Sequence, residues 1–196
     1  MSHTKSRNPY AKLAALVGGA LVIGTVGTAA AQVCQVNEWT DTRLSNAATG
    51  RCMTFSGEQV VINTACSARN PNQRWNLEPS ITRLEPGPTA PTAVVYQIKF
   101  AGAEQSCLTT GSSTSPELNI ETCEVDVPAT YPREQVRVQL WTLTPSGNGY
   151  TLCQAFGNRC LTAVASNNIS LEPSSGTIAQ RWTMSERPTT TSVGSR

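Results

Sequence analysis

Histidine is nearly absent from this sequence of 196 residues, because His3 is its only copy. His3 lies in an N-terminal segment, residues 1–31, that we expect to be cleaved, which would leave the remaining chain without histidine. Such a chain cannot build a Ser-His-Asp or Cys-His catalytic system, nor the usual histidine-containing zinc site. The sequence therefore predicts no catalytic site of these kinds, no metal site and no cofactor.

Charged residues are also few, at 14% of the sequence. Two carboxylates would still allow glycoside hydrolysis, but the acidic residues fall on predicted turns or alternate strand positions without a shared signature. Those considered are Glu58, Glu78, Glu104, Glu117, Glu121, Asp126 and Glu172. Acidic residues at such positions are typical of a solvated surface. We therefore expect a protein that is not an enzyme.

A long apolar run occurs only near the N-terminus, at residues 13–26. Basic residues precede this run, and the small residues Ala29-Ala30-Ala31 come just before Gln32. That order is typical of a secretory signal peptide cleaved after Ala31. A membrane anchor is the alternative, but the run contains glycines and is shorter than the roughly 20 residues of a spanning helix. The sequence thus predicts a secreted, extracellular protein without a membrane span.

Loss of residues 1–31 changes the charge balance. The whole chain has 15 basic and 13 acidic residues and a pI near 8.2. Lys5, Arg7 and Lys12 would leave with the segment, so 12 basic residues would remain against 13 acidic ones. A near-neutral chain lacks the excess of positive charge typical of nucleic-acid binding. We expect no nucleic-acid partner.

After Gln32, the apolar residues alternate with polar ones in short segments separated by Gly, Asn, Ser and Pro. This period of two is typical of half-buried strands. Nowhere in this part of the chain do apolar residues keep the spacing of three and four that a helix needs. The sequence therefore predicts an all-β protein with short strands.

The segments repeat three times. Each unit carries a cysteine followed by an apolar residue and threonine, and ends in Gln-x-Trp. The three Gln-x-Trp pairs are Gln73 with Trp75, Gln139 with Trp141, and Gln180 with Trp182. Because the sequence holds only 4 tryptophans, this recurrence indicates an internal repeat. Each unit of about four strands cannot bury its own apolar face, so we expect the three to share one core.

Three units of this size, each with a Cys-apolar-Thr strand and a final Gln-x-Trp, resemble the ricin B-chain type lectins. The resemblance covers residues 42–185 and implies a β-trefoil of three pseudo-symmetric units, a closed six-stranded barrel capped by three hairpins. It also implies structural roles for the repeated residues, with the tryptophans packed in the shared core and the glutamines bonded to nearby backbone.

Seven cysteines in a secreted chain imply disulfides with one cysteine left over. The resemblance implies one disulfide inside each of the first two units, Cys52 with Cys66 and Cys107 with Cys123.

The third unit needs a different pairing. Cys153 and Cys160 lie symmetrically about the Phe156-Gly157 turn, so a hairpin would place them opposite each other. Cys34 is then the odd cysteine, and if it is free, a disulfide-linked dimer through Cys34 becomes possible.

Segments outside the repeats have their own predictions. Residues 32–41 are expected to form an N-terminal arm whose Trp39 covers the bottom of the barrel, and residues 186–196 a disordered tail with little to bury. The stretches 79–93 and 124–137 contain prolines and are interpreted as long loops.

The sugar-binding positions implied by the resemblance are changed in all three units. An aspartate is expected two residues after the first cysteine, where the chain has Thr54, Thr109 and Thr162. An aromatic is expected two residues before the second cysteine, where it has Thr64, Glu121 and Glu172. Only the first unit keeps an asparagine before its glutamine, Asn72, while Val138 and Ala179 replace it elsewhere. The resemblance thus implies weak sugar binding, centred on Thr54, Asn63 and Asn72.

Two functions remain open from the sequence. The first is a secreted, non-catalytic carbohydrate-binding protein that binds glycans or glycoconjugates. The second is a β-trefoil module that binds a protein partner, such as a protease inhibitor or a toxin accessory subunit. The stretches 79–93 and 124–137 are the expected surface for the second function.

Overall fold

The computed structural model describes residues 33–57, 60–62, 65–87, 91–103, 105–111, 118–124, 127–128, 130–164 and 168–194. The expected signal segment 1–31 and Asn63 of the expected sugar site lie outside these residues.

The described chain is almost entirely β-structure, as the alternating pattern predicts. The N-terminal arm and the first unit contain β1 (Val33–Thr42), β2 (Leu44–Asn46), β3 (Met53–Phe55), β4 (Val60–Ile62), the 3₁₀ turn η1 (Pro71–Gln73) and β5 (Trp75–Arg83). The second unit contains β6 (Thr92–Phe100), β7 (Ser106–Thr110), β8 (Leu118–Thr122), the one-turn helix α1 (Glu134–Arg137) and β9 (Trp141–Ser146). The third contains β10 (Gly149–Gln154), β11 (Arg159–Val164), β12 (Asn168–Pro173), η3 (Ile178–Gln180) and β13 (Arg181–Met184), and β14 (Thr189–Gly194) follows.

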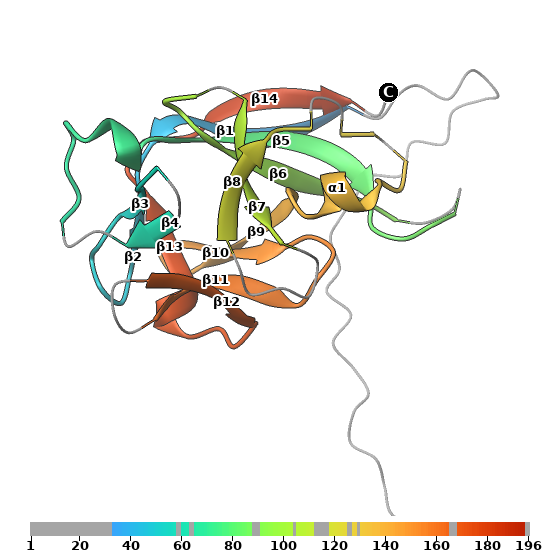
Figure 1. The fold of residues 1–196 in the computed structure, drawn as a ribbon. Helices are drawn as coiled ribbons and strands as arrows, with labels where there is room; N and C mark the ends of the chain where they lie inside the picture. The colour runs from blue at the N-terminus through green and yellow to red at the C-terminus, as the bar shows by residue number, and fades with distance from the viewer. Residues whose placement is uncertain are drawn as a thin grey trace, which may run out of the picture. The chain divides into compact units, whose positions relative to one another are not determined.

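Six strand positions form a closed barrel (Figure 1). The successive strands β1 and β2 occupy one position: β1 pairs with β5, and β2 pairs with β13. From β5 the order continues through β6, β9 and β10 to β13, and each strand is antiparallel to its neighbour. The hairpins β3–β4, β7–β8 and β11–β12 contribute one cap per unit. The expected β-trefoil is therefore confirmed.

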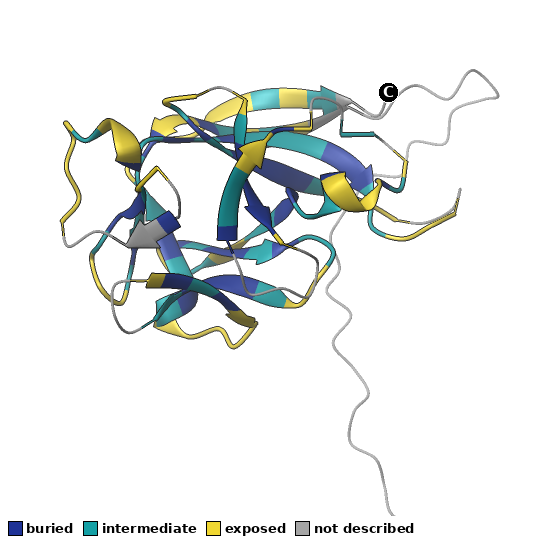
Figure 2. Cartoon of the chain, in the orientation of Figure 1, coloured by how far each residue is buried: buried dark blue, intermediate teal, exposed yellow. Residues whose placement is uncertain are grey.

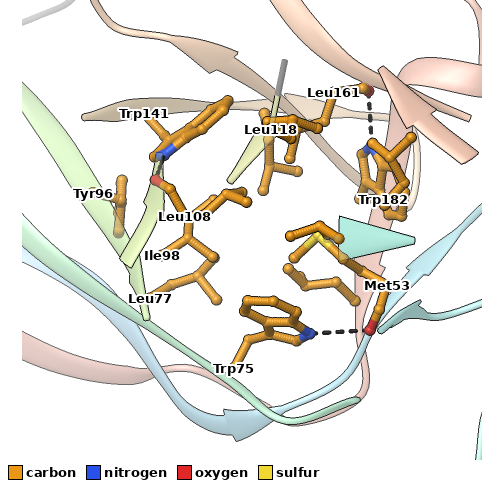
Figure 3. Close-up of a cluster of buried hydrophobic side chains, with 14 of the residues drawn as sticks. Met53, Trp75, Leu77, Tyr96, Ile98, Leu108, Leu118, Trp141, Leu161 and Trp182 are labelled. Atoms are coloured by element: carbon orange, nitrogen blue, oxygen red, sulfur yellow. Dashed lines mark hydrogen bonds between the residues drawn. The ribbon is translucent and has the colours of Figure 1, made fainter. Parts of the chain in front are cut away.

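The core lies where the three units meet, and its largest side chains come from equivalent positions. Trp75, Trp141 and Trp182 have no exposed surface. Each donates its indole N–H to the carbonyl of the apolar residue in the Cys-apolar-Thr strand of its unit, at 2.9–3.1 Å (Figure 3). These carbonyls belong to Met53, Leu108 and Leu161. A buried indole that keeps its hydrogen bond contributes packing without leaving an orphan donor.

Figure 2 shows which parts of the strands are buried. In β5 and β6, for example, Leu77 and Ile98 are completely buried and directly opposite each other. Burying an aliphatic side chain of this size contributes about 1.5–3 kcal/mol. Because many such positions come from all three units, no unit is expected to fold alone.

Trp39 of the arm closes one side of this core. It is 2% exposed, and its ring lies 6.2 Å from that of Tyr96 and 5.3 Å from that of Tyr150, measured between centroids. Burial, with a smaller effect of Tyr150, raises the pKa of Tyr96 above its usual value.

Three disulfides join the expected pairs. Cys52 with Cys66 and Cys107 with Cys123 each close a loop inside one unit. Cys153 and Cys160 face each other across the β10–β11 hairpin, as the symmetric spacing predicts. In the chain-entropy account, each of the first two loops stabilises the fold by roughly 3 kcal/mol.

The expectation of a disordered tail at residues 186–196 is wrong for most of that segment. Thr189–Gly194 forms β14, which pairs along β1 from Val33 to Glu38. The tail buries little, but the backbone of β1 offers it hydrogen bonds, and its threonines and valine favour extended structure. Composition alone hides this, because the pairing joins segments about 150 residues apart.

The stretch 79–93 is not a long loop either. The antiparallel pairing of β5 with β6 continues from Pro79 opposite Tyr96 to Arg83 opposite Thr92. Ile81 in this extension is buried, and so is Val95, which forms a second small core with Val136 and Leu140. Pro79 therefore lies within β5, and Pro91 comes just before β6.

Candidate functional site

The repeated glutamines lie inside the protein and hold the turns that follow the hairpins. Gln73, Gln139 and Gln180 are at most 3% exposed. Each accepts a backbone N–H at its Oε1, from Ser67, Glu124 and Ser175 respectively. Each donates from its Nε2 to a backbone carbonyl, that of Ala65, Thr122 or Pro173. Their side-chain amides therefore form hydrogen bonds within the protein that support the fold.

The threonines at the implied aspartate positions also point inward. Thr54, Thr109 and Thr162 are buried, and each hydroxyl donates to the carbonyl of the cysteine two residues earlier. Thr54 also accepts from Gln73 Nε2 at 3.2 Å, and Thr162 accepts from Gln180 Nε2 at 3.0 Å. Most of the hydrogen-bonding capacity of these hydroxyls is therefore used internally.

The expected sugar residues of the first unit are only partly brought together. Thr54 is 8% exposed and bonded inside, whereas Asn72 is exposed on η1. The two are linked only through Gln73, the neighbour of Asn72 that bonds to Thr54. Asn63 cannot be placed beside them, because it lies outside the described residues.

The second unit has a cleft of about 730 Å³ between its hairpin and the segment that precedes β9. Ligand sites in proteins commonly have volumes of about 300–1,000 Å³. The hairpin and the residues just after it contribute Ser106, Thr110, Gly111, Ile120, Glu121, Thr122 and Glu124, and α1 and the residues before β9 contribute Glu134, Gln135, Val138 and Gln139. We call this cavity the unit-2 cleft.

Hydrogen bonds fix both sides of the unit-2 cleft. Gln139 joins them, since its Nε2 donates to the Thr122 carbonyl and its Oε1 accepts from the Glu124 N–H, both at 2.8 Å. The Thr110 N–H donates to the Val138 carbonyl at 3.0 Å. The Cys107–Cys123 disulfide ties the two strands of the hairpin nearby. The cleft is therefore preformed by the fold.

The described residues 127–128 and 130–137 are held by contacts with the rest of the protein and with one another. The buried hydroxyl of Thr82 lies 2.9 and 3.0 Å from the carbonyls of Pro128 and Thr130. The Arg137 guanidinium lies over the Tyr131 ring, 5.1 Å from its centroid, and donates to the Tyr131 hydroxyl. These contacts hold α1, which brings Glu134 and Gln135 to the cleft.

Among the described residues that line the unit-2 cleft, the charged groups are all carboxylates. Glu134 forms an ion pair with Arg137 on the same helical turn. Glu121 and Glu124 are exposed, and among the described residues neither has a cationic partner within salt-bridge distance. The described carboxylates are not grouped closely enough to hold a metal ion. The lining can accept hydrogen bonds through carboxylates and donate them through Gln135 and hydroxyls.

The unit-2 cleft includes positions where the sequence predicts no sugar binding. Glu121 and Val138 occupy the implied aromatic and asparagine positions of the second unit, and neither residue type matches the resemblance. A different signal marks the region. Between Lys99 and Arg133 the sequence has acidic residues but no Lys or Arg.

Within the described ranges, no helix combines the length and the apolar character that crossing a membrane requires.

Comparison with known proteins gives one family. The model of the cytolethal distending toxin A/C domain matches residues 24–151. No curated protein sequence matches the chain.

Several solved structures share the fold. The designed threefold-symmetric protein ThreeFoil is 17% identical, with 74% of this chain and 97% of that one covered and a TM-score of 0.50. The protein SeviL, whose structure is bound to asialo-GM1 saccharide, is 14% identical, with 74% and 95% covered and a TM-score of 0.50. The hemolytic lectin CEL-III is 17% identical with a TM-score of 0.53. The matched region spans 75% of this chain but only 30% of CEL-III. At these identities the likeness concerns the β-trefoil.

Proposed function

The chain belongs to the cytolethal distending toxin A/C domain family, and from this premise we propose that it is a secreted, non-catalytic glycan-binding module of a toxin-like system. The unit-2 cleft is the glycan site in this proposal. Its support is the combination of a toxin family, a fold shared with lectins, and a preformed polar cleft of ligand size.

The chemistry of the unit-2 cleft suits sugar hydroxyls. Carboxylates such as Glu121 and Glu124 accept hydrogen bonds from hydroxyls, and charge-assisted bonds of this kind are roughly twice as strong as neutral ones. Gln135 adds amide donors and an acceptor on the exposed face of α1. The cleft lining has two branched apolar side chains, Ile120 and Val138, but no aromatic ring on which a sugar could stack. We therefore expect weak binding, with a Kd of about 1 mM.

A role as a toxin accessory subunit that also binds a protein is the second candidate. The observation that favours it is family membership together with the hydrogen bonds that hold Pro128 and Thr130, close to exposed residues such as Arg133 and Glu134. A protein surface held in one conformation loses little entropy on binding.

Calorimetric titration with lactose tests the glycan proposal. We expect Gln135→Ala to weaken binding about fivefold, because it removes one hydrogen-bonding group worth about 1 kcal/mol from the cleft. Asn72→Ala, a similar polar-to-alanine change at an exposed site of the first unit, serves as the control and should leave binding unchanged.

The opposite result, in which only Asn72→Ala weakens binding, would place the site in the first unit at the residues predicted from the sequence. If the secreted protein binds no glycan on a glycan array, the protein-binding function remains.

Cleavage of the expected signal segment is tested separately. Mass spectrometry of the secreted protein should find Gln32 at its N-terminus.

A further inference from the structure

We propose that the unit-2 cleft selects glycans by charge. It admits termini that are uncharged or carry an amino group, and it rejects termini that carry a carboxylate or sulfate. This inference rests on the proposed function, since it concerns the ligand class of the same cleft.

The charge of the cleft comes from carboxylates on its lining. Glu121 lies near the end of β8, and Glu124 follows just after that strand and Cys123. Both are exposed and unpaired with any cation among the described residues, so their charges act on whatever enters. Glu134 contributes less, because Arg137 neutralises it.

The surrounding sequence offers no compensating cation. Residues 100–132 contain five acidic residues and no Lys or Arg: Glu104, Glu117, Glu121, Glu124 and Asp126. Lys99, just before this stretch, is paired with Glu78 of β5. Arg137 donates to the Tyr131 hydroxyl and pairs with Glu134. Arg133, the residue before Glu134, is exposed but is not on the cleft lining.

The size of the effect follows from Coulomb's law. At about 6 Å and an effective dielectric constant of about 20, a single like charge would weaken binding roughly a hundredfold. Exposure and dissolved ions reduce this, so we expect a carboxylate on the ligand to weaken binding about tenfold at low salt. An ammonium group should strengthen binding by a similar factor.

The pseudo-symmetry of the fold supplies a matched control. Glu172 occupies in the third unit the position that Glu121 occupies in the second. It is exposed near the end of β12, accepts a hydrogen bond from the Ser170 hydroxyl, and is not on the cleft lining. Glu172→Gln therefore removes one carboxylate charge from the protein without changing the cleft.

The experiment is calorimetric titration with three related sugars: lactose, sialyllactose, and galactosyl-glucosamine with its free amine. For the unaltered protein we expect the affinity to rise in the order sialyllactose, lactose, galactosyl-glucosamine. The differences should largely disappear at about 1 M salt, where the Debye length is about 3 Å. The double variant Glu121→Gln, Glu124→Gln should bring the three affinities within about threefold, and Glu172→Gln should preserve the order.

Three results would overturn the charge selection. Sialyllactose binding as tightly as lactose to the unaltered protein would refute it and leave the glycan site intact. An equal effect of Glu172→Gln and of the double variant would show that the selection does not arise in the cleft. Failure of all three sugars to bind would remove both the charge selection and the proposed function. A circular dichroism spectrum and melting curve for each variant exclude misfolding as the cause.

Discussion

The threonines of the three Cys-apolar-Thr strands share one hydrogen bond and differ in another. All three hydroxyls donate to the carbonyl of the cysteine two residues earlier. Thr54 and Thr162 also accept from the Nε2 of the glutamine of their unit, which donates to a backbone carbonyl as well. The Nε2 of Gln139 donates to the Thr122 carbonyl. The threonine at the implied aspartate position therefore accepts an internal hydrogen bond in two units out of three.

This difference gives a prediction for stability. Thr162→Val should lower the free energy of unfolding by about 2 kcal/mol, because it removes two buried hydrogen bonds. Thr109→Val removes only the bond to the Cys107 carbonyl and should cost about 1 kcal/mol. Urea denaturation of both variants measures the difference. Equal losses would mean that the Gln180 contact contributes nothing.

The sequence predicts the buried Gln-x-Trp and Cys-apolar-Thr positions but not the unit-2 cleft, and both outcomes have the same physical reason. Gln-x-Trp and Cys-apolar-Thr are local patterns whose atoms bond within the same unit, so their recurrence is visible along the chain. The unit-2 cleft instead depends on how β8, α1 and the segment before β9 are placed in space. Glu121 read alone is an exposed strand residue, and only the fold brings it to the same cleft as Gln135.

At the scale of elements, β14 is the clearest case of structure that sequence reasoning did not find. Its residues have almost no apolar surface to bury, so composition indicates disorder. The strand forms because β1 leaves one edge available, and long-range pairing of this kind has no local signal. Side chains add to the backbone ladder, as in the hydrogen bond from Gln35 Nε2 to the Ser192 hydroxyl at 2.8 Å.

Truncation of the chain after Arg187 tests the role of β14. We expect the amides of β1 between Val33 and Glu38 to exchange with deuterium much faster, because their partners in the ladder are lost. Amides of β5 and β6 should keep their protection, since these strands pair within the barrel. Hydrogen exchange with mass spectrometry measures both. Unchanged exchange in residues 33–38 would mean that β14 does not protect β1 in solution.

At the scale of the whole molecule, three similar units carry different charges. The second unit has a long acidic stretch without Lys or Arg, whereas the first has Arg43, Arg51, Arg69, Arg74 and Arg83. The shared core constrains the buried positions of all three units, but the surfaces of the caps are free to diverge. A pseudo-symmetric fold can therefore present one glycan cleft rather than three.

The proposed function places one glycan site on each chain, so a monomer would be monovalent, and this has a measurable consequence. We expect a titration stoichiometry near one and no cross-linking of beads coated with lactose, because cross-linking needs two sites in one particle. Cys34, which lies outside the three disulfides, is predicted from the sequence to allow a disulfide-linked dimer, and such a dimer would be bivalent. Bead aggregation should then appear in oxidised protein, disappear with reductant, and be absent from Cys34→Ser under all conditions. Aggregation by the Cys34→Ser monomer would instead reveal a second glycan site, for which the exposed Asn72 of the first unit is the first residue to test.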